Sequence, residues 1–341
     1  MNLLISAFLL LEKNSLRLIQ SYWEKTMEGK LKMERPEVSI LIVTHNHENE
    51  IAKTIESILA QEFFNYEIVI VDCASTDSTC KILSGFPQAK IIQADRNLGY
   101  AGGMNLALAH STGELVLFCN PDILMLPGCI SSLVDPARNH STEAVSFAPK
   151  LLLDLQGAPN KKNLPILDST GIEPNFLQLL PSDRGQGQPD WRQFDGLWDV
   201  FGPTGALSLW RRSALDRIAI EGRIFDESFH SYFEDVDLAA RARIAGYKCR
   251  YVASARAVHP RKGPLAKGID VEARAFVNRY RLGLRCMRLG WHVPRLKVHE
   301  AARLLYRSTK SGRYLIHFSR LLMDIPKIFR QRKMIFSFSK K

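Results

Sequence analysis

The first third of the chain alternates between short apolar runs and segments of helical periodicity. The apolar runs are rich in Val, Ile and Leu and end in polar or turn-forming residues, a pattern typical of buried strands. They cover residues 38–43, 67–71, 90–93 and 115–119. Between the first two runs, Ile51, Ile55 and Ile58 recur at helical spacing. This alternation predicts an α/β fold with a mostly parallel central sheet, flanked by helices and built with right-handed crossovers.

The pattern continues less regularly beyond Pro127. It predicts a helix ending at Ala137, a helix ending at Gly246 and a helical region that extends to the end of the chain. It also predicts strands at residues 144–153 and 248–252 and apolar order at residues 200–210. Residues 154–198 show no regular period, and a stretch of that length in a compact domain is more often functional than accidental.

Polar side chains follow four of the predicted strands, at the point where each strand ends. They are Thr44 and Asn46, Asp72, Arg96 and Asn97, and Asp122. The carboxyl ends of parallel strands meet at one edge of the sheet, where open α/β folds bind their ligands. Carboxylates and guanidinium groups gathered there suit a nucleotide and a divalent cation. Taken alone, Asp122 is either a helix N-cap or a metal ligand.

The charge of the chain is unevenly distributed. The net charge is +11 over 341 residues, yet residues 261–341 hold 21 Lys and Arg against 4 Asp and Glu. A basic tail of this kind indicates an acidic partner, such as anionic lipid, nucleic acid or a phosphorylated substrate. The sequence contains no recognisable nucleic-acid-binding module, so we expect no nucleic acid partner.

The tail is also amphipathic, because apolar residues such as Leu315, Leu321 and Ile328 recur among Lys and Arg from about Ser308 onward. That pattern suits the anionic surface of a membrane. Two alternatives stay open, namely a helix packed on the catalytic domain and a contact in a homo-oligomer.

Two further features bear on the compartment. The six cysteines show no CxxC spacing, which favours buried thiols in a reducing compartment over disulfides or zinc. The apolar run from Leu3 to Leu11 is shorter than the roughly 20 residues that span a bilayer, and no basic region precedes it. We therefore expect a cytoplasmic protein, with a peripheral position on the inner face of the cell membrane as the further hypothesis.

A set of motifs, in a fixed order, resembles the family 2 inverting glycosyltransferases of the GT-A fold. The motifs are Thr44-His45-Asn46 after the first strand, Val71–Asp77, Arg96–Asn105, Asn120-Pro121-Asp122, Asp168–Gly171, Asp183-Arg184-Gly185, Thr204-Gly205-Ala206, Phe233–Leu238 and His259. The later motifs, and the interval from Asp235 to His259, look like the rhamnosyltransferase-type branch. The resemblance implies a GT-A catalytic domain at residues 36–285, after an N-terminal extension (1–35) and before a basic amphipathic helical tail (286–341). Within the domain, it implies a nucleotide-sugar half (36–125) and an acceptor and catalytic half (126–285).

The resemblance also implies a role for each matching residue. Thr44, Asn46 and Asp72 would hold the base and ribose of the nucleotide, and Arg96, Asn97 and Asn105 would face the ribose or pyrophosphate. Asp122 and His259 would ligate Mg²⁺ or Mn²⁺, and Asp235 would be the general base. We expect Glu234 and Asp237 to orient this base or to cap the helix. Trp198 and Gly205 would shape the sugar and acceptor pockets. Asn120 departs from the family pattern, because a neutral amide stands where an acidic residue is usual, and we expect it to weaken metal affinity.

The chemistry read from the residues agrees with this resemblance. Transfer with inversion needs one carboxylate near the acceptor hydroxyl and a cation at the leaving diphosphate, and it needs no nucleophile. We therefore predict transfer of a sugar, with dTDP-L-rhamnose as the first candidate donor, to a hydroxyl of a cell-surface glycan or lipid-linked acceptor. A metal-dependent nucleotidyltransferase and an inactive nucleotide-sugar-binding protein are the alternatives. The first would be expected to carry a Gly-rich basic loop after the first strand.

Overall fold

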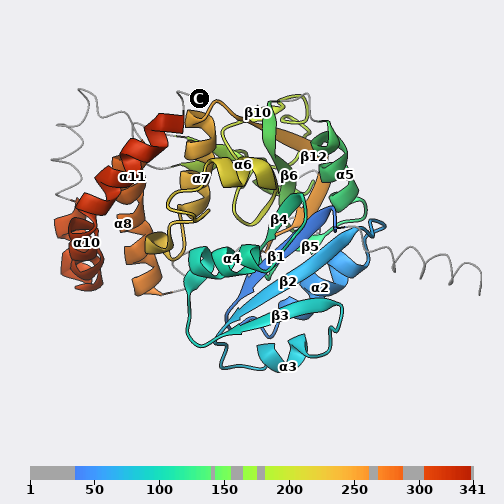
Figure 1. The fold of residues 1–341 in the computed structure, drawn as a ribbon, viewed down its shortest axis with the longest axis horizontal. Helices are drawn as coiled ribbons and strands as arrows, with labels where there is room; N and C mark the ends of the chain where they lie inside the picture. Colours follow the sequence, from blue (N-terminus) through green and yellow to red (C-terminus); the bar gives the residue numbers. More distant parts are fainter. Residues whose placement is uncertain are drawn as a thin grey trace, which may run out of the picture. The chain divides into compact units, whose positions relative to one another are not determined.

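In the computed structural model, the chain divides into two compact units, residues 1–36 and 37–341. The structure describes residues 35–139, 143–154, 164–174, 181–260, 268–286 and 303–338. The predicted N-terminal extension lies almost wholly outside the described residues, and the division into 36–285 and 286–341 stays a prediction. Figure 1 shows the elements of the larger unit around one central sheet.

The N-terminal half of the sheet consists of four parallel strands in the order β3-β2-β1-β4. Their bounds are Val38–Thr44 for β1, Tyr66–Cys73 for β2, Ala89–Ala94 for β3 and Leu115–Cys119 for β4. The four predicted apolar runs are thus confirmed as strands. Thr44 pairs in register with Asp72, so the polar ends of β1 and β2 meet at the same edge.

The C-terminal half of the sheet changes direction at β11 (Leu207–Arg211), which runs antiparallel to both of its neighbours, β4 and β6. Beyond it, β6 (Ala144–Asp154) and β12 (Lys248–Val258) are parallel to each other. The predicted fold class is confirmed, and the inverted strand β11 lies between two parallel regions. β12 extends past the predicted end at Val252, through a register irregularity.

The segment predicted to lack regular structure contains short strands. Within the described residues, this segment contains β7 (Ile166–Ser169), β8 (Ile172–Glu173) and β9 (Ser182–Asp183), and the sheet has two further short strands elsewhere, β5 (Leu124–Met125) and β10 (Asp199–Val200). Because β7 and β8 are short and separated by a turn, their alternation is too brief to register as a period. Residues 155–163 and 175–180 lie outside the described residues.

Helices cover both faces of the sheet because successive strand residues point in opposite directions. In β1, Ile40 and Ile42 pack in the core layer that contains α2 and α5, and Leu41 and Val43 pack in the layer that contains α4, α6 and α7. The helices are α2 (Ile51–Leu59), α3 (Thr79–Leu83), α4 (Gly99–Ala109), α5 (Cys129–Arg138), α6 (Arg212–Arg217) and α7 (Glu234–Ile244). A single 3-10 turn, η1 (Glu227–Phe229), precedes α7.

The C-terminal helices α10 (Arg313–Met323) and α11 (Ile325–Ser337) pack against α8 (Ile269–Cys286), as Figure 1 shows. A small apolar cluster joins Phe276 of α8 to Tyr314 and Leu321 of α10 and to Ile328 of α11. Packing on the catalytic domain, one of the predicted alternatives for the tail, is therefore confirmed for these helices.

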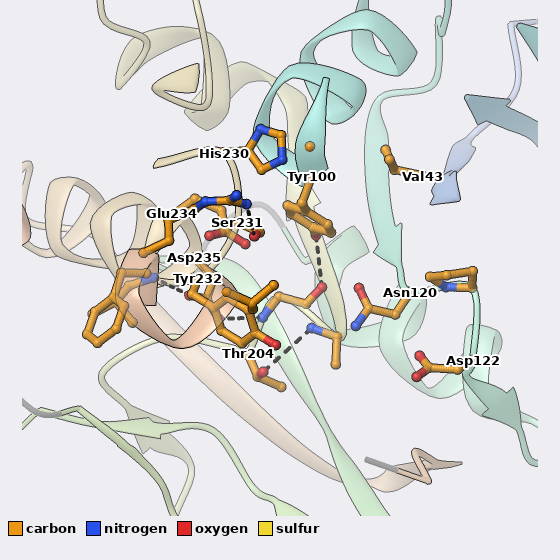
Figure 2. A pocket seen from close by; sticks show the side chains of 18 of the residues that line it. Val43, Tyr100, Asn120, Asp122, Thr204, His230, Ser231, Tyr232, Glu234 and Asp235 are labelled. Carbon is orange, nitrogen blue, oxygen red and sulfur yellow. Dashed lines mark hydrogen bonds between the residues drawn. The ribbon is translucent and has the colours of Figure 1, made fainter. Parts of the chain in front are cut away.

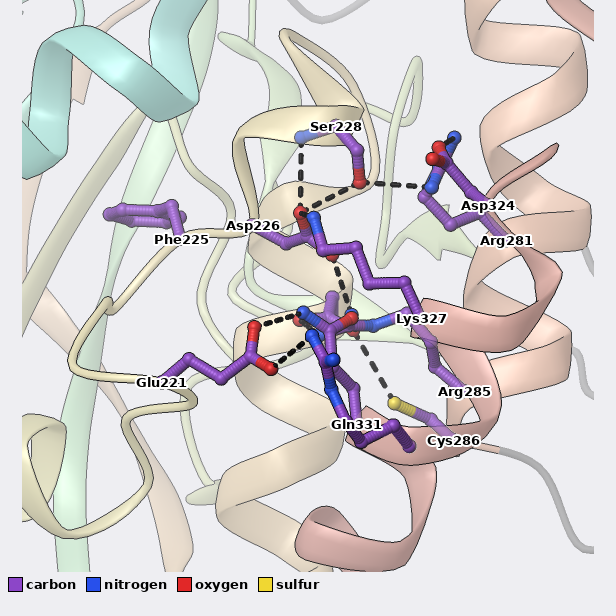
Figure 3. Close-up of polar contacts among 12 residues, drawn as sticks. Glu221, Phe225, Asp226, Ser228, Arg281, Arg285, Cys286, Asp324, Lys327 and Gln331 are labelled. Atoms are coloured by element: carbon purple, nitrogen blue, oxygen red, sulfur yellow. Dashed lines mark hydrogen bonds and ion pairs between the residues drawn. The ribbon is translucent and has the colours of Figure 1, made fainter. Parts of the chain in front are cut away.

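Buried charges also link α8 and α11 to the rest of the domain (Figure 3). The Arg285 guanidinium, fully buried, lies 2.6 Å from Asp226 and donates to Gln331 of α11. Lys327 of α11 lies 3.1 Å from Asp226, and Asp324, between α10 and α11, lies 2.8 Å from Arg281 of α8. None of the helices in the described part of the chain combines the length and apolar character needed to cross a bilayer.

Candidate active site

A cavity of about 480 Å³ opens at the carboxyl edge of the parallel strands, where β1 and β4 end. The loop that leads into α7 forms the opposite wall, and α4 and α8 contribute from the sides. Figure 2 shows Asn120 and Asp122 on one side of this cavity and Glu234 and Asp235 across from them. The arrangement agrees with the ligand-binding edge expected for an open α/β sheet.

One end of the cavity holds a carboxylate and an imidazole that face each other. Asp122 Oδ1 and His259 Nε2 are 3.6 Å apart, and this carboxylate oxygen is buried with no hydrogen-bond partner among the described residues. The other ring nitrogen, His259 Nδ1, lies 2.8 Å from the buried Asp168 carboxylate. A carboxylate at Nδ1 orients an imidazole so that Nε2 presents its lone pair to a metal ion.

These side chains fit a divalent cation that is completed by substrate. Within the described ranges, no group of three or more His, Cys, Asp and Glu side chains could hold a metal ion. Asp122 and His259 would supply two ligands, and the remaining positions would fall to water and diphosphate oxygens, as Mg²⁺ sites commonly arrange. An unpartnered, buried carboxylate oxygen is costly without a cation or donor, which supports the fit.

The other end of the cavity holds Asp235, in the first turn of α7. Its Oδ2 accepts from Gly205 N at 2.8 Å, and its Oδ1 accepts from Val236 N at 2.8 Å. Tyr100 donates its hydroxyl to the Gly205 carbonyl, also at 2.8 Å. A Cβ at position 205 would lie 3.1 Å from the Asp235 Cβ, so a glycine is what lets this backbone approach the carboxylate.

Glu234 lies beside Asp235, and its carboxyl group is buried. Its Oε2 finds no hydrogen-bond partner in the described part of the chain. Burial, followed by the nearby Asp235 charge, raises the pKa of Glu234 well above its usual range. Burial likewise raises the pKa of Tyr100, and the charges of Glu234 and Asp235 add to this effect. At this end, the cavity wall therefore brings the carboxyl groups of two consecutive residues, Glu234 and Asp235, close together.

The loop before α7 has an unusual backbone. His230, Tyr232 and Phe233 all have positive φ values, between 59° and 74°, and such conformations cost about 1–3 kcal/mol each for residues other than glycine. Asn278, buried on α8, holds this loop by donating its amide to the carbonyls of Phe229, Ser231 and Tyr232 at 2.8–3.0 Å.

The first residue of α4 accommodates the same loop. Gly99 has a φ of +68°, and a Cβ there would lie 2.5 Å from the His230 ring. Burial and the neighbouring Arg274 lower the pKa of His230 to about 4, so this imidazole is neutral at neutral pH. The close approach of Gly99 and the hydrogen bonds from the buried Asn278 amide together fix the position of this strained loop, from which the first turn of α7 enters the cavity.

The structure brings most of the predicted site residues together around the cavity. Thr44, Asn97, Asn120, Asp122, Gly205, Glu234, Asp235 and His259 all belong to its described lining. The predicted roles of these residues remain predictions, but their common location agrees with them.

Five predicted residues lie outside the described lining, namely Asn46, Asp72, Arg96, Asn105 and Trp198. Asp72 is buried and accepts hydrogen bonds from Ser75. The Asn105 side chain bonds both backbone groups of Phe225, and Asn46 accepts from Thr76 N.

The last two of these residues are exposed. Arg96 lies in the exposed turn before α4. Trp198 is 63% exposed, with the Arg250 guanidinium 5.5 Å from its ring. Residue type at a strand end does not reveal whether the side chain turns toward the cavity or into a local turn, because both suit polar groups.

Arg274 is a cavity residue that the sequence did not single out. It comes from α8, lines the cavity and lies 2.8 Å from Asp270. Its only signal in the sequence was its place in the basic region, and that signal does not distinguish Arg274 from the other Lys and Arg residues there. Tyr100 and Asp183, which also line the cavity, occurred in the family motifs without an assigned role.

Comparison with known proteins agrees with this geometry. Residues 39–153 match the family model described as glycosyl transferase family 2. The chain is 31% identical over 202 residues to the protein named "Putative glycosyltransferase EpsE" of Bacillus subtilis, over 58% of this chain and 69% of EpsE. The chain belongs to glycosyl transferase family 2. The sequence-based identification of the family is thereby confirmed.

Two further similarities bear on this glycosyltransferase. It is 30% identical over 211 residues to the N-acetylglucosaminyl-diphospho-decaprenol L-rhamnosyltransferase of Mycobacterium tuberculosis, covering 56% of this chain and 66% of the relative, so a third of that protein lies outside the match. The mannosyltransferase PcManGT of Pyrobaculum calidifontis, solved with GDP-Man and Mn²⁺, superposes with a TM-score of 0.52 at 18% identity, over 94% of this chain and 92% of that chain. This structural likeness confirms the GT-A fold.

Proposed function

We propose that this glycosyltransferase transfers a sugar, with inversion at the anomeric carbon, from a nucleotide-sugar to a hydroxyl group of a glycan. One observation carries the proposal: a single cavity has the Asp122–His259 pair at one end and Asp235 at the other. The Asp122–His259 pair suits the diphosphate of a donor, and the Asp235 carboxylate suits the hydroxyl of an acceptor.

The acceptor side follows from the contacts of Asp235. The carboxylate accepts the proton of the attacking hydroxyl, and that oxygen then displaces the nucleoside diphosphate in one step, which inverts the anomeric centre. The Gly205 and Val236 amides fix the orientation of the carboxylate. Direct displacement needs no nucleophile from the protein, so one correctly placed base is sufficient.

The donor side follows from Asp122 and His259. These residues would hold Mg²⁺ or Mn²⁺, and the cation supplies positive charge next to the departing diphosphate. Asp168 fixes the His259 ring, and Arg274 of α8 adds a guanidinium to the cavity lining. Guanidinium groups pair well with phosphate oxygens, which makes Arg274 a further candidate beside the predicted Arg96.

The names of the similar proteins suggest specific substrates. The relative from Mycobacterium tuberculosis is a rhamnosyltransferase whose name specifies a diphospho-decaprenol acceptor, which supports dTDP-L-rhamnose as the first donor to test and a lipid-linked glycan as the acceptor class. The structural neighbour that contains GDP-Man and Mn²⁺ makes GDP-sugars the second donor class and Mn²⁺ the first cation.

The test uses the Asp235→Asn variant. We expect loss of transfer by about a hundredfold or more, because general bases contribute about 10²–10⁴ to rate, while donor binding in a thermal-shift assay with Mn²⁺ stays as in the wild type. Asp216→Asn makes the same chemical change at an exposed position on α6 and should leave transfer unchanged. NMR of the product gives the anomeric configuration.

Two outcomes would overturn the proposal. Wild-type turnover by Asp235→Asn would remove this carboxylate from the reaction. A product that retains the donor's anomeric configuration would exclude direct displacement.

A further inference from the structure

The outward face of α10 is apolar. Leu315, Ile316, Leu322 and Met323 are 51%, 45%, 50% and 73% exposed. Leu315 and Leu322 are seven residues apart, as are Ile316 and Met323, so all four project from the same side of the helix. A soluble helix normally presents charged and polar groups on the side away from its core.

The opposite face of α10 fixes which side points outward. Tyr314, His317 and Leu321 are buried, and Tyr314 and Leu321 belong to the cluster with Phe276 of α8. His317 Nε2 lies 3.1 Å from Asp270 of α8. Figure 1 shows α10 lying along α8. The helix is therefore held by one face, and its apolar outer face is presented from a defined position.

Exposed apolar residues concentrate in this part of the chain. Of the twelve large hydrophobic residues that are exposed in the described regions, seven fall within residues 303–338. They are Leu305, Tyr306, Leu315, Ile316, Leu322, Met323 and Phe329. Isolated exposed apolar residues are ordinary, whereas a group of this size on neighbouring helices marks an interaction surface.

The same segment is strongly basic. Residues 303–338 contain nine Lys and Arg and one acidic residue, Asp324. Arg313 and Arg320 of α10 are exposed, and helical geometry places both on one flank of the apolar face. Lys333 of α11 is also exposed. An apolar stripe with basic residues along its edge matches the boundary between acyl chains and anionic headgroups.

We propose that the outer face of α10, defined by Leu315, Ile316, Leu322 and Met323, docks the protein on the surface of an anionic phospholipid bilayer. The positive charge favours an anionic bilayer over a second copy of the chain as the partner, since two such basic faces would repel each other. The exposed apolar residues favour a bilayer over a nucleic acid, because nucleic-acid binding requires basic groups but no exposed aliphatic stripe. The proposal does not depend on the sugar-transfer reaction.

Vesicle co-sedimentation of the full chain tests this surface without any sugar nucleotide. Wild-type protein should bind phosphatidylcholine vesicles that contain phosphatidylglycerol, bind pure phosphatidylcholine weakly, and lose binding as salt rises. Leu322→Ser with Met323→Ser should weaken binding to the anionic vesicles about tenfold or more. Arg313→Gln with Arg320→Gln should do the same, because both flank the apolar face and each basic residue near the surface contributes separately.

Phe64→Ser is the matched control. Phe64 is 83% exposed between α2 and β2, so its loss removes an exposed apolar side chain of the catalytic domain and should leave vesicle binding unchanged. All of these substitutions are at exposed sites, so equal melting temperatures will show that each variant is folded.

Three outcomes would overturn the proposal. The first is equal binding to anionic and neutral vesicles. The second is wild-type binding by Leu322→Ser with Met323→Ser. The third is light scattering that shows a dimer which the same pair of substitutions dissociates, with no vesicle binding by the wild type; that result would assign the face to a second copy of the chain.

Discussion

Two neighbouring carboxylates of α7, one that lines the cavity and one that contacts α8, are buried in opposite electrostatic environments. Toward the cavity, Glu234 is buried with an unpartnered oxygen in the described structure, and its pKa is raised. Three residues later, Asp237 is equally buried but lies 2.9 Å from Arg241 and 2.7 Å from Arg285. Burial alone would raise the pKa of Asp237, but the two guanidinium groups outweigh it and the pKa is lowered.

The difference distinguishes, on one helix, a carboxylate that stabilises the fold from one that lines the candidate active site. On the tail side, each charge is neutralised locally, and the contacts join α7 to α8 and, through Arg285 and Gln331, to α11 (Figure 3). On the cavity side, one carboxyl oxygen of Glu234 has no hydrogen-bond partner among the described residues. A buried acid without a hydrogen-bond partner is costly, and groups with strongly shifted pKa values cluster at functional sites. The following substitutions test this comparison, from the largest expected effect to the smallest.

Breaking the compensated side should cost the most stability. Arg285→Met leaves Asp237 and Asp226 buried without their shared guanidinium, and we expect a loss of about 3–5 kcal/mol in the free energy of unfolding, measured by urea denaturation. Arg138→Met is the control, because Arg138 makes a similar paired contact with Glu37 at an exposed site and should cost less than about 1 kcal/mol. Equal costs for the two variants would contradict the comparison.

The loop before α7 gives the next largest expected effect. Asn278→Ala removes the donor to three carbonyls of the loop, and we expect a loss of about 1–3 kcal/mol in stability. Because Asn278 acts by positioning the loop that carries α7, kcat should fall more than KM rises. A purely structural residue would lower the melting temperature and leave kcat unchanged in the folded protein.

On the cavity side, Asp122→Asn tests the uncompensated carboxylate at the strand end. It removes the charge but keeps the shape, so the affinity for a nucleoside diphosphate should fall roughly tenfold or more in the presence of Mn²⁺ and little in the presence of EDTA. Calorimetric titration in both conditions measures the difference. If the fall is the same with and without Mn²⁺, Asp122 acts on the nucleotide by some route other than a cation.

Glu234→Gln should have the smallest effect, and its sign is opposite to the others. A raised pKa in the folded state means that the folded protein binds more protons than the unfolded chain, so stability falls as pH rises above the usual carboxyl range. Glutamine removes this titration. We expect the variant to be more stable than the wild type by about 1 kcal/mol near neutral pH, with no advantage near pH 4. Parallel pH profiles for the two proteins would show that Glu234 is not a buried acid.

Asp237 should show the reverse pH dependence. Its lowered pKa provides stability that is present above the usual carboxyl pKa and is lost as pH falls through the folded value. The wild-type protein should therefore lose stability at acid pH, and Asp237→Asn should flatten this part of its profile. Denaturation curves of the wild type and the two variants over a range of pH measure both of these opposite dependences of stability on pH.

Much of the fold was predictable because its signals are local. The apolar runs of β1 to β4 and the polar residues that end them lie within a few positions of each other, so the sheet and its ligand-binding edge could be inferred directly. Asp122, Asp235 and His259 were also identified from the sequence, through family motifs, and all three line the cavity. The inverted strand β11 was missed because an apolar run carries no sign of its direction.

The part of the site that escaped prediction depends on contacts distant in sequence. Asp168 orients His259 from 91 positions away, and Asn278 holds a loop some 46–49 positions earlier. The positive φ values of the loop before α7 belong to His, Tyr and Phe, which give no hint of such a backbone, as a glycine would.

By itself, the sequence determined the family, the parallel half of the sheet and the edge where ligands bind, since each follows from residue patterns within a strand or motif. Only the tertiary structure decided which polar residues face the cavity, placed Arg274 on its wall and turned one face of α10 outward. These outcomes depend on which helix packs against which loop, and that choice is made by burial summed over the whole domain rather than by neighbouring residues.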